Sequence, residues 1–177
     1  YDQGTDIQLE FIEKAIEAVE LQNGMVAAIV QMSCAIKDDS TTKAVKKRLL
    51  AKHHLKAVIS MPDDLFYPIG VVTCIMVFET NKANSGKKTW FGYLKNDGFI
   101  KRKNKGRIDY YSKWKDIKKS FLEAYIDNEE IPGLSVKKEV SFNDEWCAEA
   151  YMETDYSSIQ ISDFEKILKE YSIFKTI

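Results

Sequence analysis

Length, composition and charge limit the kinds of protein that this chain can be. Its 177 residues, 45% of them hydrophobic and 12% aromatic, favour one domain with a substantial core and exclude a disordered or low-complexity segment. No apolar run reaches the roughly 18 residues of a membrane span, and the polar N-terminal residues do not resemble a signal peptide, so we expect no membrane contact. The net charge of −1 hides a strong asymmetry, because residues 82–119 hold 13 basic and 3 acidic side chains whereas residues 120–177 hold 5 and 13. Near-neutrality therefore does not argue against a nucleic-acid partner.

The first 60 residues predict alternating helices and strands. Apolar residues at spacings of three and four predict an amphipathic helix over about 6–21, and an Asn-Gly pair follows it. The apolar run 25–32 lacks alternation, so we expect a strand that is covered on both faces in a parallel sheet. A helix over 42–52 and a short strand over 56–60 come next. This order is typical of an open α/β sheet.

A long β-branched strand over 71–79 comes after the loop 61–70. That loop is too short for a crossover helix, so we expect the strand to be antiparallel to its predecessor at 56–60. The rest of the sequence predicts a strand at 89–94, a mobile basic loop at 101–107, a helix at 113–126, a strand at 134–140 and a last helix at 162–174. Because the sequence becomes polar after Thr80, we place a boundary there between residues 1–80 and residues 81–177.

Few side chains have the spacing of a metal or catalytic site. His53 and His54 are adjacent and lack partner ligands, so we expect them to cap the end of the second helix. Cys34, Cys74 and Cys147 are widely spaced and odd in number, which predicts neither a zinc motif nor a disulfide framework. Free thiols favour a reduced, cytoplasmic setting. No glycine-rich phosphate loop is present.

Two aromatic residues precede a proline in the loop between the two antiparallel strands. Phe66 allows two interpretations, a plug under the sheet or a ring on the surface, and the plug is favoured. Tyr67 is held extended by Pro68, so we expect its ring to point out of the loop. A ring presented in this way can stack on a base or on a ligand.

Several blocks of the sequence, taken in order, resemble N6-adenine DNA methyltransferases. The blocks are residues 24–30, 48–50 with 55–62, 65–78 and 90–99. The similarity is greatest to the modification subunits of type I restriction–modification systems and their relatives. It is strong over about residues 7–109 and weaker from there to the C-terminus. The order and spacing of the blocks carry the resemblance, since no block is diagnostic alone.

The resemblance implies a fold and a cofactor. Residues 1–80 would form the C-terminal half of a Rossmann-like methyltransferase domain with an antiparallel terminal strand pair, and residues 81–177 a mixed α/β extension. The family binds S-adenosylmethionine through a glycine-rich motif and catalyses through Asn/Asp-Pro-Pro-Tyr/Phe, and neither motif is present in this chain. Tyr1 stands where the last aromatic residue of the catalytic motif would fall. We therefore expect the parent enzyme to use S-adenosylmethionine and this chain alone to be inactive.

The resemblance also implies a substrate and partners. Tyr67, with Phe66 beside it, would pack against an adenine flipped out of DNA. Five cations would contact the DNA backbone, unless they form only a solvated loop: Lys101, Arg102, Lys103, Lys105 and Arg107. Expected protein partners are the specificity and restriction subunits of the same system and, through an uncovered sheet edge, a second copy of the chain. The alternatives are a non-catalytic nucleic-acid-binding or subunit-assembly module and a methyltransferase that acts on RNA or protein.

Overall fold

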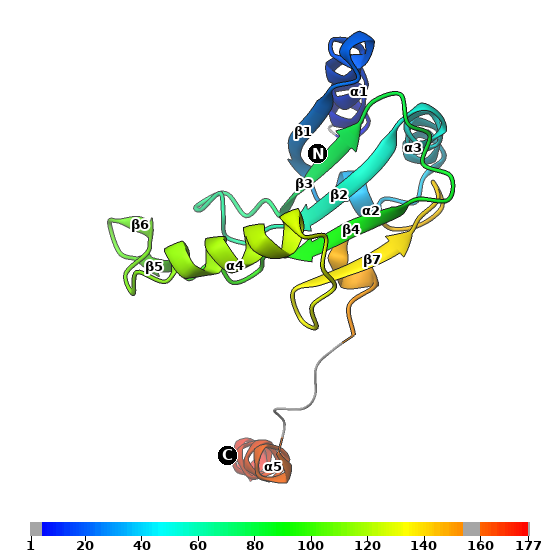
Figure 1. Ribbon diagram of the computed structural model, residues 1–177. Helices are drawn as coiled ribbons and strands as arrows, with labels where there is room; N and C mark the ends of the chain where they lie inside the picture. The colour runs from blue at the N-terminus through cyan, green and yellow to red at the C-terminus, as the bar shows by residue number, and fades with distance from the viewer. Residues whose placement is uncertain (1–4, 154–159, 177) are drawn as a thin grey trace.

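The computed structural model describes residues 5–153 and 160–176 (Figure 1). Its elements in chain order are α1 (Thr5–Glu17), the 3-10 turn η1 (Glu20–Gln22), β1 (Met25–Gln31), α2 (Ser33–Ile36), α3 (Ser40–Lys52), β2 (His54–Ser60), β3 (Thr73–Glu79), β4 (Lys88–Tyr93), β5 (Ile100–Arg102), β6 (Gly106–Ile108), α4 (Trp114–Ile126), β7 (Ser135–Glu139), η2 (Ala148–Ala150) and α5 (Ile161–Thr176). The helices expected from the sequence correspond to α1, α3, α4 and α5, and the expected strands to β1, β2, β3, β4 and β7. In these two ranges no helix is long and apolar enough to cross a membrane.

Five strands form one mixed sheet in the order β1-β3-β2-β4-β7. β3 is antiparallel to both β1 and β2, so the antiparallel pair expected from the short loop 61–70 is confirmed. β4 is parallel to β2 and antiparallel to β7. The sheet therefore continues across residue 80, because β4 and β7 extend the part that β1, β2 and β3 form.

The edge strand β1 differs from its prediction. It is neither parallel to its neighbour nor covered on both faces, since it pairs with β3 alone among the described residues and its side chains alternate. Val26 and Val30 are buried, whereas Met25 and Ile29 on the opposite face are more than half exposed. The unbroken apolar run predicted a fully buried strand because the run contains no information about which face the rest of the chain covers.

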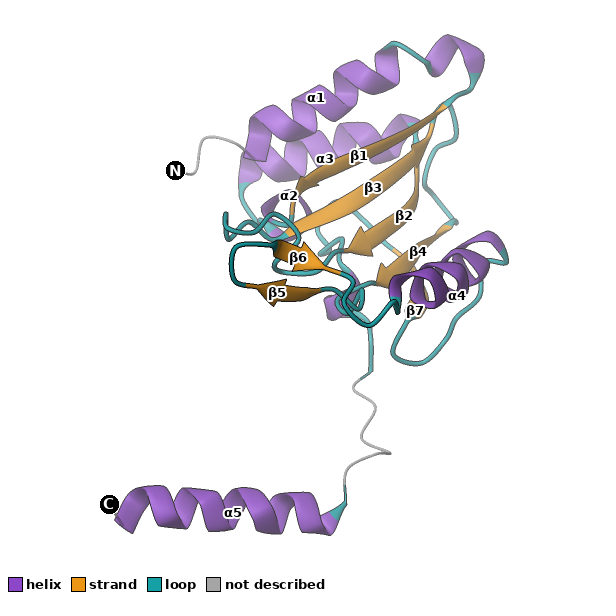
Figure 2. Ribbon diagram, turned by 90° about the vertical axis from the view of Figure 1, so that its left-hand side faces the viewer, coloured by secondary structure: helices purple, strands orange, loops and turns teal. Residues whose placement is uncertain are grey.

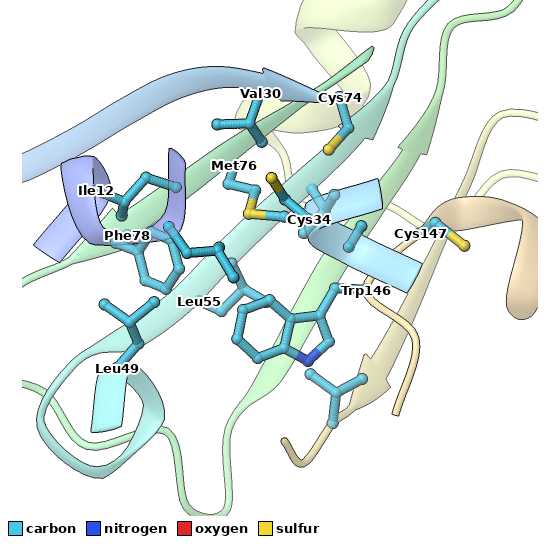
Figure 3. Close-up of a cluster of buried hydrophobic side chains, with 14 of the residues drawn as sticks. Ile12, Val30, Cys34, Leu49, Leu55, Cys74, Met76, Phe78, Trp146 and Cys147 are labelled. Carbon is cyan, nitrogen blue, oxygen red and sulfur yellow. The ribbon is translucent and has the colours of Figure 1, made fainter. Parts of the chain in front are cut away.

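The main core lies between the sheet and the helices α1, α2 and α3 (Figure 2). Its largest side chain is Trp146, which is fully buried and meets Phe78 of β3 edge-on with ring centroids 6.4 Å apart (Figure 3). The indole Nε1 of Trp146 donates to the carbonyl of Ser141 (2.9 Å). A segment near residue 146 thus completes the core that residues 5–80 begin.

A smaller core lies between the opposite face of the sheet and α4. Trp90 of β4 packs edge-on against Phe121 and Tyr125 of α4, with centroids 5.5 and 5.3 Å away. Its ring lies over Gly92, where an added Cβ atom would be 2.3 Å from the indole. Glycine is therefore required at this position by packing.

One local expectation is wrong and another holds in part. Residues 101–107 do not form a loop but the hairpin β5–β6, in which the turn has Asn104 at φ 61° and β6 begins with Gly106 at φ 70°. His53 is the C-cap residue of α3, as expected, and its backbone N–H donates to the carbonyl of Leu49 (2.8 Å). Its Nδ1 accepts the backbone N–H of Asn81 (3.2 Å), whereas His54 does not cap the helix but is the buried first residue of β2. Burial lowers the pKa of both rings.

Candidate nucleic-acid interface

The loop that joins β2 to β3, residues 61–72, projects from the carboxyl end of β2. Ligands of open α/β sheets bind beyond the carboxyl ends of the strands. Tyr67 is 53% exposed and Phe66 is 43% exposed, and Ile69 near them in the chain is exposed as well. Tyr67 points outward as expected, but Phe66 is not the core plug that the sequence favoured, because the loop runs over the surface in successive turns. The loop therefore presents two aromatic rings to solvent.

The hairpin β5–β6 lies beside this loop and carries most of the expected cations. Lys101, Arg102, Lys103 and Lys105 are all exposed on it. The ammonium of Lys101 lies 3.3 Å from a carboxylate oxygen of Asp64 and 5.3 Å from the ring centroid of Tyr67. Cations and aromatic rings thus share one surface at the end of the sheet.

Arg107 is placed differently from the other four cations. Its side chain is only 10% exposed, and its Nη2 donates to both carboxylate oxygens of Asp97 at 2.8 and 2.9 Å. Its Nε lies 2.9 Å from Oδ1 of Asp64, an ion-pair contact that lacks the geometry of a hydrogen bond. The guanidinium therefore sits between two carboxylates, one from the loop 61–72 and one from the turn after β4.

A second ionic cluster holds the start of the same loop. Lys95 lies 2.6 Å from a carboxylate oxygen of Asp63 and 3.1 Å from one of Glu149. Glu149 also accepts a hydrogen bond from the buried hydroxyl of Ser60, the last residue of β2. Burial opposes the charge of Lys95, but the two carboxylates outweigh it and raise the pKa of the ammonium. The sequence gives no signal for this cluster, since Glu149 is distant from Ser60 in the chain.

Two further aromatic rings near the hairpin were not predicted. Tyr110 and Tyr111 are exposed, and their ring centroids lie 5.0 Å apart. The guanidinium of Arg102 lies 4.5 Å from the centroid of Tyr110, and Nζ of Lys113 lies 5.7 Å from that of Tyr111. A Tyr-Tyr pair directly after a basic stretch is the sequence signal that could have identified them.

Comparison with known proteins identifies the family. The family model of the N-6 DNA methylases matches residues 3–175. The chain belongs to this family. It is 31% identical over 172 residues to the type II restriction enzyme and methyltransferase RM.BcgI of Heyndrickxia coagulans, and the match covers 95% of this chain and 26% of that protein. The chain thus spans about a quarter of the length of this relative.

Solved structures show the same fold. The type I restriction–modification methyltransferase subunit from Streptococcus thermophilus superposes with a TM-score of 0.58 at 21% identity, over 75% of this chain and 26% of that one. A chain from a structural study of complex assembly and conformational transition of the type I system gives 0.60 at 17% identity, over 95% of this chain and 37% of that one. The expected methyltransferase-type α/β fold is thereby confirmed. N-6 DNA methylases use S-adenosylmethionine and methylate adenine in DNA.

In residues 5–153 and 160–176 of this N-6 DNA methylase chain, the structure points to no residue that would hold the cofactor or a metal. The glycine-rich cofactor motif is absent from its sequence. At the carboxyl end of β1, the backbone N–H of Gln31 already donates to Oε1 of Gln8 (2.9 Å). Among the residues with assigned structure, no cluster of His, Cys, Asp and Glu could hold a metal ion. Tyr1, the expected last residue of the catalytic motif, lies outside the described residues.

Proposed function

We propose that this chain supplies the target-base side of an adenine-N6 DNA methyltransferase in a restriction–modification system. In this proposal residues 1–80 are the C-terminal half of the catalytic domain, and residues 81–177 are an extension built onto the same sheet. The observation that carries it is the pair of exposed rings, Tyr67 and Phe66, beside a hairpin with four exposed cations. The family's activity agrees with this chemistry.

Each part of this surface has a role in the proposal. An adenine flipped out of the duplex loses its stacking, and an aromatic face restores roughly 1–3 kcal/mol of it. The exposed ring of Tyr67 provides that face, with Phe66 next to it. The hairpin cations Lys101, Arg102, Lys103 and Lys105 attract the phosphates and hold the strand in register without reading its sequence.

The stacking role can be tested with a fluorescent adenine analogue. We expect the chain to quench 2-aminopurine in a single-stranded oligonucleotide, because stacking on a ring quenches the base. Tyr67→Ala should weaken binding about 5- to 150-fold, as the loss of 1–3 kcal/mol requires, whereas Tyr67→Phe should bind nearly as well. Tyr171→Ala, which removes an exposed tyrosine on α5, is the matched control. Equal binding by Tyr67→Ala and the control would refute the stacking role.

Methyl transfer needs groups that this chain does not contain. The family's Asn or Asp and prolyl carbonyl are absent, so we expect no transfer of labelled methyl from S-adenosylmethionine to DNA by the chain alone. We propose that Tyr1 is the aromatic residue of the motif in the parent enzyme. Transfer of label by the isolated chain would contradict this assignment of roles.

A second candidate function is subunit assembly, and the observation that favours it is α5. Every described side chain of this helix is exposed, including an apolar set at helical spacing: Ile161, Phe164, Ile167, Leu168, Tyr171, Ile173 and Phe174. Such a stripe is typical of a helix that packs on a partner. We propose the specificity subunit as that partner. Because α5 carries three acidic and three basic side chains, the contact would depend on its apolar stripe and not on net charge.

The assembly role has its own measurement. Leu168→Glu should abolish co-purification with the specificity subunit and leave the binding of 2-aminopurine oligonucleotides unchanged. Glu165→Gln, a change at another exposed position of α5, should leave both co-purification and oligonucleotide binding unchanged. If Leu168→Glu leaves co-purification intact, α5 is not the contact. In the isolated chain, the outer edge of β1 offers a second interface, through which we propose that the chain pairs with another copy. Ile29→Lys should then lower the mass measured by light scattering.

A further inference from the structure

We infer that Arg107 is a positioning residue, which fixes the loop 61–72 and thereby the ring of Tyr67, and that it is not a contact to DNA phosphate. The placement of the loop by Arg107 concerns the chain by itself, whereas what Tyr67 binds rests on the proposed function. The inference separates Arg107 from the four exposed cations with which the sequence groups it.

The surroundings of Arg107 leave little of its guanidinium for a phosphate. Nη2 donates to both carboxylate oxygens of Asp97, and the carboxylate of Asp64 lies beside Nε. The ring centroid of Phe99 lies 5.3 Å from the guanidinium carbon. The side chains of Arg107 and Asp97 are 10% and 8% exposed. A buried arginine with two carboxylates is costly to take apart, because each group left behind would be an unpaired charge. The two carboxylates repel a phosphate, and the small exposed fraction of the side chain leaves it little access to the guanidinium.

One end of the network is anchored in the fold. Oδ1 of Asp97 accepts the backbone N–H of Phe99 (3.0 Å), and the ring of Phe99 meets Trp114 of α4 edge-on, 6.0 Å between centroids. Gly98, at φ 81°, lies so close to the start of α4 that an added Cβ would be 2.9 Å from Cβ of Lys113. The turn that presents Asp97 is therefore packed against α4 and cannot shift without disturbing it.

The other end of the network reaches the aromatic loop. Asp64 lies three residues before Tyr67, and its carbonyl accepts the backbone N–H of Tyr67 (3.1 Å). Its carboxylate also faces Lys101, whose ammonium lies near the Tyr67 ring. Exposure rises along the path, from the buried Asp97 and Arg107 through Asp64 to Tyr67. A rigid interior thus holds an exposed ring, and such preorganisation lowers the entropic cost of ordering the loop when a base binds.

Salt dependence distinguishes a positioning residue from a phosphate contact. The binding constant K for a single strand falls as the salt concentration rises. Each lost phosphate contact makes the slope of log K against log salt concentration less steep by about 0.7. With the full chain and the 2-aminopurine oligonucleotide, we expect Lys103→Met to lower the slope by that amount. Arg107→Met should leave the slope unchanged and weaken binding at every salt concentration by a similar factor, on the order of tenfold. A slope lowered by Arg107→Met would overturn the inference.

A conservative substitution gives the opposite result for the two roles. Lysine keeps the charge that a phosphate needs but cannot span two carboxylates as a guanidinium does. We therefore expect Arg107→Lys to bind as weakly as Arg107→Met. Wild-type affinity for Arg107→Lys would overturn the inference.

Hydrogen exchange tests the loop without any ligand. Asp64→Asn disturbs only the loop end of the network, so it should speed amide exchange in residues 61–72 by about tenfold or more while the melting temperature stays near that of the wild type. Arg107→Met should speed the same amides, and Lys103→Met should not. Unchanged exchange in Asp64→Asn would refute the positioning role even if Arg107→Met fails to fold. If the loop loosens but neither Lys103→Met nor Tyr67→Ala alters oligonucleotide binding, the positioning role stands and the proposed function fails.

Discussion

Lys46 of α3 is a buried charge whose removal should change how stability depends on pH. Its side chain is only 2% exposed, and its Nζ donates to the carbonyls of Ala35 (2.6 Å) and Asp144 (3.3 Å). The ammonium also lies 4.8 Å from the ring centroid of Trp146. Lys46 thus connects α2 to the segment that completes the main core. Burial lowers the pKa of its ammonium from 10.5 to about 8, although nearby carboxylates oppose this. The informative change is Lys46→Met, which keeps the length of the side chain and removes the titrating group.

The sign of the effect follows from proton binding. Between pH 8 and pH 10.5 the unfolded chain holds its proton on Lys46 more tightly than the folded chain does. The free energy of unfolding contributed by Lys46 therefore rises with pH across this window and is constant on either side. The difference between a pKa of 10.5 and one of about 8 corresponds to ~3 kcal/mol, of which ~2 kcal/mol falls between about pH 7.5 and about pH 10.

Other titrating groups lower the stability as pH rises, so Lys46→Met is needed as a reference to isolate the contribution of Lys46. Burial raises the pKa of Cys74 to about 12, that of Cys147 to about 11 and that of Tyr151 to about 12. Because these folded-state values are raised, stability falls as pH rises from the ordinary values of 9 for cysteine and 10 for tyrosine toward them. The difference between wild type and Lys46→Met cancels these contributions, because both proteins contain the same cysteines and tyrosine.

The assay is urea unfolding followed by tryptophan fluorescence at a series of pH values. The unfolding free energy of Lys46→Met is subtracted from that of the wild type at each pH. This difference should increase by ~2 kcal/mol from about pH 7.5 to about pH 10. Lys47→Met removes an exposed neighbour and should give a constant difference. A Lys46→Met difference that is flat or falls with pH would refute the reasoning.

Two other properties follow from the packing of the cores. Gly92→Ala should lower the free energy of unfolding by about 1–3 kcal/mol, because the new methyl group would meet the rings of Trp90 and Phe121. At Gly70 no atom lies within 4 Å of an added Cβ, so Gly70→Ala should change the free energy of unfolding by less than about 1 kcal/mol. Chemical denaturation of both variants measures this, and equal stabilities would contradict the packing argument. The three buried cysteines should react slowly with a thiol reagent in the native chain and rapidly in urea, since the thiolate is the reactive form and burial disfavours it. Fast labelling of the native chain would show that this core opens readily.

The sequence predicts helices and strands better than it predicts which side chains contact one another in the folded chain. Hydrophobic periodicity identified α1, and the short loop after residue 60 required an antiparallel β3, because both are local constraints. The exposed face of β1 was missed since periodicity does not reveal what lies over a strand. Among the site residues, Tyr67 is exposed as predicted, but it lies in a run of turns and not in the extended segment that the following proline indicated. Arg107 looked like its neighbours in a basic stretch, and only the tertiary position of Asp97 and Asp64 distinguishes it.

The direction of the strands explains how the proposed parts of the site would come together. β1 and β2 are both antiparallel to β3, so they are parallel to each other and their carboxyl ends lie at the same edge of the sheet. The loop that bears Tyr67 leaves from that edge. The free side of β1 borders an apolar groove of about 360 Å³ shared with α1, where Phe11 and Ile29 are exposed. A further parallel strand paired with β1 would fill the uncovered side and end at the same edge. In the proposed methyltransferase, a catalytic motif at the end of that strand would lie toward the loop 61–72, where Tyr67 would hold the base to be methylated.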